Sequence, residues 1–359
     1  MLHDHIWHKA LDQRQSARVM FTDYAKAFDH VDHAVVIMKL TAFGLHDVLV
    51  HWFCSLFKGR QQRVVVGKHM SDWTALMGAM PQGSWFGPLT FLVLMNDLTA
   101  ECHAHKFVDG TTLSQVLGVD QHSRMQNNLD DIVTLSAASL MNINIKKAEE
   151  MQLGDGMRKQ LYQELTLQGN AIDNVKSYEL LGIYVTETLN WDVHILATLS
   201  KAFKQIHFLK QLWHVIVSTA DLVTYYNSVI RSVIQSACPV WLSSLIWGQS
   251  PEIERMQKCA LRCILGDVNY KEACSTHGLI TVPDCHEPLT KHFFEQLTHP
   301  GSCLTHLIPQ KHDLSIYLHH THLRELPKTQ TSHYTNSVLL YWILIVQFYL
   351  CLTACTFSL

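Results

Sequence analysis

Two carboxylates in this sequence stand beside strand-like runs, where they could bind metal ions. The apolar run at 19–21 leads into Asp23, and Asp109 stands in an Asp-Gly pair between the runs 106–108 and 111–113. Asp-Gly is a strong signal for a type I′ β-turn, so we expect a hairpin with Asp109 at its tip. Two carboxylates fixed on strands could bridge paired Mg²⁺ ions about 3.5–4 Å apart, as two-metal phosphoryl transfer requires. An isolated Asp-Gly pair is, however, more often only a turn.

The segments around these carboxylates form an ordered set of motifs. They are DYAKAFD at 23–29, PQGSWFGPLTF at 81–91, NDL at 96–98 and FVD at 107–109. In this order the motifs resemble the reverse transcriptase palm of LINE-type, jockey-like non-LTR retrotransposons. The resemblance continues through 178–182, 189–192 and 256–262, and it covers roughly residues 15–300.

The resemblance implies an α+β fold, in which a right-hand polymerase palm is followed by a helical thumb. The palm would be an antiparallel sheet with helices on one face. We expect a palm with partial fingers at 1–188, a thumb at 189–248, a helical post-thumb region at 249–310 and a tail at 311–359. Because the family carries a long fingers segment before the palm, we also expect this chain to be truncated at its N-terminus.

The activity implied by the resemblance is RNA-directed DNA polymerisation, which extends a DNA primer on an RNA template with dNTPs and two Mg²⁺ ions. Asp23 and Asp109 would be the catalytic metal ligands. Phe28 would be the steric gate that excludes a 2′-hydroxyl, and ordinary core packing is the alternative. Lys147 would protonate the leaving pyrophosphate as a general acid. A solvated lysine is an equally good interpretation.

Four further residues would contact the substrate by resemblance. Gln82, Gly83 and Ser84 belong to the loop that holds the template base and the nascent pair. The alternative is an ordinary turn in which Ser84 caps the helix that follows. Gly182 would allow close approach to the primer backbone in a hairpin at 178–185, or it serves only strand packing.

The sequence departs from the family pattern at the hairpin tip. The family has Phe or Tyr, Ala, Asp, Asp, whereas this chain has Phe107, Val108, Asp109 and Gly110. Glycine preserves the turn and removes one negative charge from the expected metal site. We therefore expect a crippled polymerase, and the alternative is a catalytically inactive relic with weak nucleic-acid binding.

Composition adds constraints on the class of protein. The net charge is −3, which is unusual for a nucleic-acid binder, and the 10 cysteines lack paired spacing, which favours a reduced, intracellular protein. The N-terminus has no apolar signal region, so the expected location is the cytoplasm or nucleus. Most of the 24 histidines are expected on the surface. The cysteines and histidines at 259–286 lack a CxxC pair, so zinc is not favoured.

The remaining pattern predicts mainly helices. Two are expected within 34–58, the first ending at Gly44 and the second at 48–57, and others at 87–98, 120–141, 193–245 and 252–300. By resemblance, 141–147 is the family's fourth motif, in which a lysine follows an Asn-containing strand. Lys39 is expected on the outer side of its helix. The buried face of the helix from 193 is expected to hold Leu199, Phe203, Ile206 and either Leu209 or Trp213. A hairpin at 62–76 would present Arg60, Arg63 and Lys68, either to the template backbone or as a solvated rim.

The segment 338–359 contains no charged residue. As a helix it could cross about 30 Å of hydrocarbon, so membrane contact or a membrane-tethered protein of unknown role is one interpretation. Drifted sequence without a role is the other. The sequence does not indicate an oligomeric state.

Overall fold

The computed structural model describes residues 2–76, 78–80, 83, 86–118, 121–154, 162–245, 249–299, 301–308, 327–337, 339–341 and 343. The chain forms two compact units, Ser16–Lys176 and a second made of Met1–Gln15 with Ser177–Leu359. These two units do not test the expected borders of the palm, thumb, post-thumb region and tail, so those borders stay predictions.

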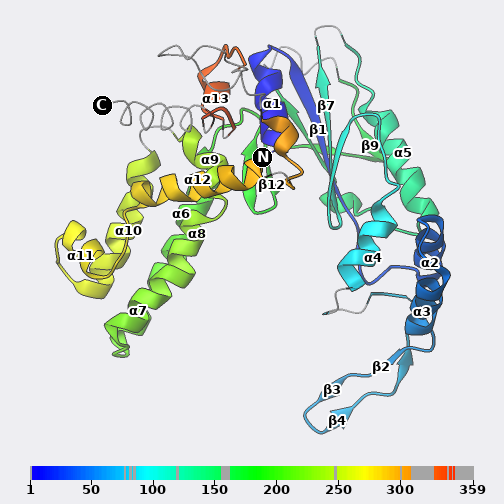
Figure 1. The fold of residues 1–359 in the computed structure, drawn as a ribbon, viewed down its shortest axis with the longest axis horizontal. Coiled ribbons are helices and arrows are strands. Elements are labelled where there is room, and N and C mark those ends of the chain that lie inside the picture. Colours follow the sequence, from blue (N-terminus) through cyan, green and yellow to red (C-terminus); the bar gives the residue numbers. More distant parts are fainter. Residues whose placement is uncertain are drawn as a thin grey trace. The chain divides into compact units, whose positions relative to one another are not determined.

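A five-stranded sheet forms the centre of the unit Ser16–Lys176, in the order β11-β8-β1-β7-β6 (Figure 1). Its strands are β1 (Ser16–Asp23), β6 (His103–Phe107), β7 (Gly110–Leu117), β8 (Glu149–Leu153) and β11 (Asp173–Asn174). The central β1 pairs antiparallel with β7 and β8, and β6 pairs antiparallel with β7. The short β11 runs parallel to β8, so the sheet is mixed rather than wholly antiparallel. The expected α+β class is confirmed.

Helices pack against one face of this sheet, as expected. They are α2 (His33–Ala42), α3 (Asp47–Phe57), α4 (Phe86–Met95) and α5 (Met125–Ala138). Met20 of β1 and Leu113 of β7 belong to one buried core with Phe91 of α4 and Leu129 of α5. Because side chains alternate along a strand, Asp23 lies on the sheet face opposite to Met20.

A hairpin extends from the end of α3 (Figure 1). Within it β2 (Gln61–Gln62) pairs with β5 (Thr74–Ala75), and β3 (Val65–Val66) pairs with β4 (His69–Met70). This agrees with the expected hairpin at 62–76. The Arg63 guanidinium lies 4.6 Å from the centroid of the Trp73 ring. A template contact by Arg60, Arg63 or Lys68 stays a prediction.

The sheet contains a buried ion pair that the sequence pattern did not indicate. Arg18 of β1 is 2% exposed, and its Nε donates to Glu150 Oε1 of β8 at 2.6 Å. A second guanidinium nitrogen donates to Glu150 Oε2 at 3.2 Å and to the carbonyl of Gln163 at 2.5 Å. Since these bonds satisfy both charged groups, the pair is a structural element of the sheet.

The second unit is mainly helical. A short hairpin of β12 (Ser177–Leu180) and β13 (Ile183–Thr186) precedes its long helix α6 (Asp192–His214). The other longer helices are α1 (Leu2–Asp12), α10 (Gln249–Leu265) and α12 (Val282–Thr298). The shorter helical elements are α7 (Thr219–Tyr225), η3 (Tyr226–Arg231), α8 (Ser232–Gln235), α9 (Cys238–Trp241), η4 (Leu242–Ser244), α11 (Tyr270–Thr276), η5 (Thr305–Leu307) and α13 (Ser332–Thr335).

The buried face of α6 differs from the expected one. Leu199, Ile206 and Leu209 are buried, but Phe203 is 54% exposed and Trp213 is 52% exposed. Ala202 takes the core position instead, with none of its surface exposed. Of the two alternatives Leu209 and Trp213, Leu209 is the buried one. The expectation for Phe203 was wrong because hydrophobic side chains extend around more than one side of this helix, so spacing alone does not identify the buried face.

The apolar C-terminal segment begins inside the second unit. Of the residues 338–359, the structure describes 339–341 and 343. Leu339, Leu340 and Ile343 are at most 3% exposed, in one cluster with Phe294 and Leu297 of α12. The rest of this segment lies outside the described residues. Among the helices that the structure describes, none is both long and apolar enough to cross a membrane.

Candidate active site

The pairing of β1 with β7 brings the two carboxylates together. Asp23 is the last residue of β1, and its register partner is Gly110, the first residue of β7. Asp109 immediately precedes Gly110 in the loop that joins β6 to β7. The chain segments around 23 and 109 are thus adjacent on neighbouring strands, as the two-carboxylate hypothesis requires.

The turn itself differs from the expected one by one position. The strands close at the pair Phe107 and Gly110, so the two loop residues are Val108 and Asp109. Val108 has a φ of 53°, whereas Gly110 is not among the glycines with positive φ. A β-branched residue rarely adopts positive φ, so the tip is strained at Val108 and Gly110 supplies no special backbone freedom.

Burial and neighbouring charges set the electrostatics of the pair. Burial and the nearby Asp23 carboxylate raise the pKa of Asp109, and the Lys147 ammonium opposes this effect. The side chain of Asp23 is 17% exposed, and Lys147 Nζ lies 2.5 Å from its Oδ2. Lys147 therefore balances part of the negative charge that two neighbouring carboxylates create.

Lys147 reaches Asp23 because the segment before it pairs with the chain after β1. Ala25 N donates to Asn142 O at 2.8 Å, and Asn144 N donates to Asp23 O at 2.7 Å. Residues Ile145–Lys147 then form the 3₁₀ helix η1. The Asn-containing strand expected before Lys147 is thus wrong: Ile143 forms an isolated bridge with Tyr24, and Ile145–Lys147 is helical.

The residues present can hold Mg²⁺ in part. Two neighbouring carboxylates offer the oxygen ligands that Mg²⁺ prefers, and water or phosphate oxygens commonly complete its coordination. Within the described part of the chain, no group of three or more Asp, Glu, His or Cys side chains is placed to hold a metal. The pair therefore suits a site that depends on the substrate for further ligands.

The predicted substrate residues lie in several places. The Phe28 ring is half-buried against Phe91 of α4, with ring centroids 4.7 Å apart. The backbone carbonyl of Phe28 accepts a hydrogen bond from Met80 N at 2.9 Å. That bond ties Phe28 to the residue just before the PQGS motif. Gly83 has a φ of +79°, which favours glycine, and a Cβ atom added there would meet no other atom within 4 Å. Gln82 and Ser84 lie outside the described residues.

Gly182 belongs to the second unit. It shares the two-residue turn between β12 and β13 with Leu181, and both residues have positive φ, 83° and 52°. This is the geometry of a type I′ turn, in which glycine is favoured. A contact between Gly182 and a primer stays a prediction.

Comparison with known proteins identifies the family. The sequence profile for "Reverse transcriptase (RNA-dependent DNA polymerase)" matches residues 1–185, which is more than half of the 359 residues. The chain belongs to the reverse transcriptase family.

Two relatives from mobile elements are distantly similar to this chain. The probable RNA-directed DNA polymerase from transposon BS of Drosophila melanogaster is 22% identical over 309 residues, covering 79% of this chain and 33% of that protein. The RNA-directed DNA polymerase from mobile element jockey of Drosophila funebris is 22% identical over 199 residues, covering 52% and 21%. A structure of telomerase from Candida albicans, with a TWJ fragment of telomeric RNA, is similar at a TM-score of 0.37 and 9% identity, covering 78% of this chain and 54% of that one.

The resemblance to jockey-like reverse transcriptases is therefore confirmed as a distant similarity. The chain spans no more than a third of the length of either polymerase, at 33% and 21%. The polymerase activity of these longer proteins is therefore not assigned to this chain by similarity alone.

Two lysines bind the end of α4, which corrects the position expected for Lys39. Lys39 Nζ donates to Leu94 O at 2.5 Å and to Asp97 Oδ1 at 2.6 Å, so it faces inward rather than outward. Lys106 Nζ donates to Met95 O at 2.8 Å. Both lysines bind carbonyls at the C-terminus of α4, where cations are favoured by the helix dipole. The NDL motif at 96–98 directly follows this helix, and its Asp97 is one of the groups that Lys39 binds.

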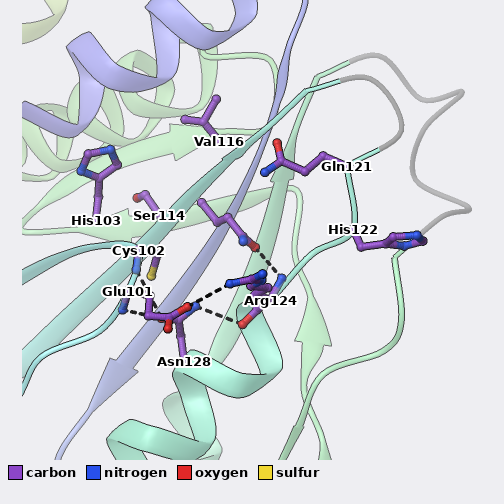
Figure 2. Close-up of a pocket in the computed structure, with 10 residues that line it drawn as sticks. Glu101, Cys102, His103, Ser114, Val116, Gln121, His122, Arg124 and Asn128 are labelled. Carbon is purple, nitrogen blue, oxygen red and sulfur yellow. Dashed lines mark hydrogen bonds and ion pairs between the residues drawn. The ribbon is translucent and has the colours of Figure 1, made fainter.

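A cavity of about 690 Å³ lies at the other end of the β6–β7 hairpin from Asp109 (Figure 2). Its polar groups already bind one another: Glu101 N donates to Asn128 Oδ1 at 2.8 Å, and Arg124 Nη1 lies 3.4 Å from Glu101 Oε2. Burial raises the pKa of the Cys102 thiol to about 11, so this thiol stays protonated at neutral pH. The cavity therefore lacks an activated nucleophile, and the chemistry is better placed at Asp23 and Asp109.

Proposed function

We propose that this chain is the reverse transcriptase domain of a non-LTR retrotransposon, which extends a DNA primer on an RNA template with dNTPs. The observation that carries the proposal is the register that puts Asp23 opposite Gly110 and beside Asp109. Membership of the reverse transcriptase family supports the reaction class. The similarity to polymerases of mobile elements supports the origin.

In this proposal Asp23 and Asp109 hold two Mg²⁺ ions, as the family resemblance implies. When bound, such ions stabilise the charge that develops on the transferred phosphate. Lys147 releases Asp23 and turns its ammonium toward the leaving pyrophosphate, to which it gives a proton. Phe28 blocks the 2′-hydroxyl of a ribonucleotide, and its contact with Phe91 holds the ring in place.

The loop residues Gln82, Gly83 and Ser84 position the nascent base pair in this proposal, and Gly182 lets the primer backbone approach. Gly110 weakens the reaction because it provides no third carboxylate next to Asp109. Each ~1.4 kcal/mol of lost stabilisation in the transition state slows the reaction about tenfold. We therefore expect activity well below that of a site with three carboxylates.

The proposal is tested by primer extension on poly(rA)/oligo(dT) with dTTP and Mg²⁺. We expect slow extension by the wild-type chain and none by Asp23→Ala, because one carboxylate cannot hold the ions that two hold. Asp29→Ala is a matched control that removes an exposed carboxylate of the same motif. Extension by Asp23→Ala at the wild-type rate would exclude the proposed site.

A second candidate function is a catalytically inactive relic that binds nucleic acid weakly. The ion pair between Lys147 Nζ and Asp23 Oδ2 at 2.5 Å favours it, because this lysine competes with a metal ion for the carboxylate. The two functions are separated by Mg²⁺-dependent binding of dTTP to the template-primer complex. Binding that needs Mg²⁺ supports the polymerase, and binding that ignores Mg²⁺ supports the relic. The intracellular location expected from the sequence stays a prediction under either function.

A further inference from the structure

The segment MQKCALR at 256–262 lies on α10, and the polymerase site does not account for it. Met256, Gln257, Ala260 and Leu261 are at most 2% exposed, so core packing explains them. Lys258 and Arg262 are exposed on the opposite side of the helix. Their spacing of four residues puts both cations on one helix face. A core role therefore explains four of the seven residues of the motif and leaves the two cations unexplained.

These cations border a cavity of about 350 Å³ between α10 and α11. Leu261, Leu265 and Val268 provide its apolar lining, and the Tyr270 ring forms one wall. Lys258 Nζ lies 5.1 Å from the centroid of that ring. The volume is at the lower end of the range of about 300–1,000 Å³ for small-molecule sites, so it suits one nucleotide.

The Tyr270 ring is held in place by a buried network. Its hydroxyl donates to Glu254 and accepts from Gln257 Nε2 at 2.9 Å. Gln257 is fully buried, and its Oε1 accepts from the Tyr226 hydroxyl at 2.7 Å. Because the hydroxyl is bound inside the unit, the ring is fixed as a flat surface beside two cations.

The cations are only weakly engaged. Arg262 Nε lies 3.7 Å from Asp267 Oδ1, and these side chains are 77% and 96% exposed. An exposed pair of this kind contributes about 0–1 kcal/mol, and an exposed cation–π contact about 0.5–1 kcal/mol. A phosphate group with a full negative charge can displace both contacts, after which the Tyr270 ring is available for stacking by a base.

We propose that this cavity binds one nucleotide of a single-stranded nucleic acid. Lys258 and Arg262 hold the phosphate, and Tyr270 stacks with the unpaired base. A groove that combines cations with an aromatic platform is the usual form of single-strand recognition. The site lies outside residues 1–185, which match the polymerase family, so it adds a nucleic-acid contact in the second unit.

The test is fluorescence anisotropy of a labelled U15 RNA with the full chain, titrated at several salt concentrations in EDTA. Each phosphate contact on a single strand contributes about 0.7 to the slope of log K against log salt. We expect Lys258→Ala/Arg262→Ala to lower that slope by about 0.7, because both cations hold the same phosphate. We expect Tyr270→Leu to weaken binding about fivefold or more at an unchanged slope, because stacking is uncharged. EDTA removes the metal, so the result does not depend on polymerase activity.

One control accompanies these variants. Lys291→Ala on α12 removes an exposed charge of the same unit that does not line the cavity. It is expected to bind like the wild type, with circular dichroism confirming the fold of every variant. An equal loss for Lys291→Ala, or an unchanged slope for the double variant, would overturn the proposal.

Photocrosslinking of the wild-type chain gives an answer that needs no variant. A 5-iodouridine RNA is expected to crosslink to the peptide that contains Tyr270, and crosslinks confined to 16–176 would refute the site. The proposed contacts involve the phosphate and the base but not the 2′-hydroxyl. Binding of single-stranded DNA as well as RNA would therefore support the proposal. Binding of duplex alone contradicts it.

Discussion

The substitution Gly110→Asp restores the carboxylate of the family pattern. We expect it to destabilise the fold without metal and to cause no destabilisation when Mg²⁺ is present. Residue 110 lies directly opposite Asp23 and follows Asp109. A Cβ atom at Gly110 would lie 3.5 Å from Phe107 O, which is ordinary contact, and its φ is not positive. The new side chain therefore fits without steric strain, and its charge determines the outcome.

The size of the effect follows from the register. Directly opposite residues on antiparallel strands have Cβ atoms about 4.5–5.5 Å apart. Two carboxylates about 5 Å apart repel by about 1 kcal/mol at the dielectric constant of water and about 3 kcal/mol at an effective value of 20. Without metal we therefore expect Gly110→Asp to be about 1–3 kcal/mol less stable than Gly110→Asn, which has the same shape and no charge.

The assay is thermal unfolding of the wild type, Gly110→Asp and Gly110→Asn in EDTA and in Mg²⁺. For a unit of this size, ~1 kcal/mol corresponds to about 2–4 °C in Tm. In EDTA the Asp variant should melt below the Asn variant, and in Mg²⁺ it should melt at the same temperature or higher. In primer extension, Gly110→Asp should exceed the wild type about tenfold or more. If the difference between Asp and Asn is the same with and without Mg²⁺, the carboxylates do not share a metal site.

Two further predictions concern the stability of each unit. Burial lowers the pKa of His194 from 6.5 to about 4. Because the unfolded state binds more protons between these values, the free energy of unfolding falls as the pH drops through this window, by about 3 kcal/mol between pH 6.5 and 4. The variant His194→Gln should lose much less stability over the same pH range, as measured by urea unfolding. An equal loss in the variant would assign the pH dependence to other groups. Arg18→Met leaves Glu150 buried without its partner and should cost about 3–5 kcal/mol, whereas Arg18→Met/Glu150→Leu should regain most of it in the same assay. A double variant no more stable than the single one would contradict the ion-pair reasoning.

The sequence predicted the strands that carry the carboxylates but not the details of their turn. Apolar β-branched and aromatic runs identified β1 and the β6–β7 hairpin, because such runs bury well in a sheet. The Asp-Gly pair predicted a turn at 109–110, because glycine is favoured at positive φ, whereas the structure has its turn at 108–109. Pairing of β7 with β1 instead keeps Gly110 in the strand and transfers the positive φ to Val108. Tertiary pairing thus overrode the local preference.

Side chains whose partners lie far away in the chain were the least predictable. Lys39 was expected at the surface, yet its stem crosses to the end of α4 and its ammonium binds Leu94 O. Most histidines were expected on the surface, yet His194 is 4% exposed, and its Nδ1 accepts a hydrogen bond from Tyr184 N at 3.4 Å. Periodicity along the sequence does not encode such contacts, and a long apolar stem lets a charged group reach them.

Two departures from the family pattern fall on the hairpin tip, at Val108 and Gly110, and the strands on either side of the tip are paired in register. Replacing the alanine of the pattern by valine adds a β-branched side chain at a φ of 53°, and replacing the aspartate by glycine removes a charge. Neither change alters the core of Met20, Leu113 and the helices behind them. A loss confined to the tip would weaken chemistry without unfolding the sheet, so the proposed function predicts a folded chain with little polymerase activity. The same reasoning explains why one substitution, Gly110→Asp, is expected to recover activity on an otherwise unchanged scaffold.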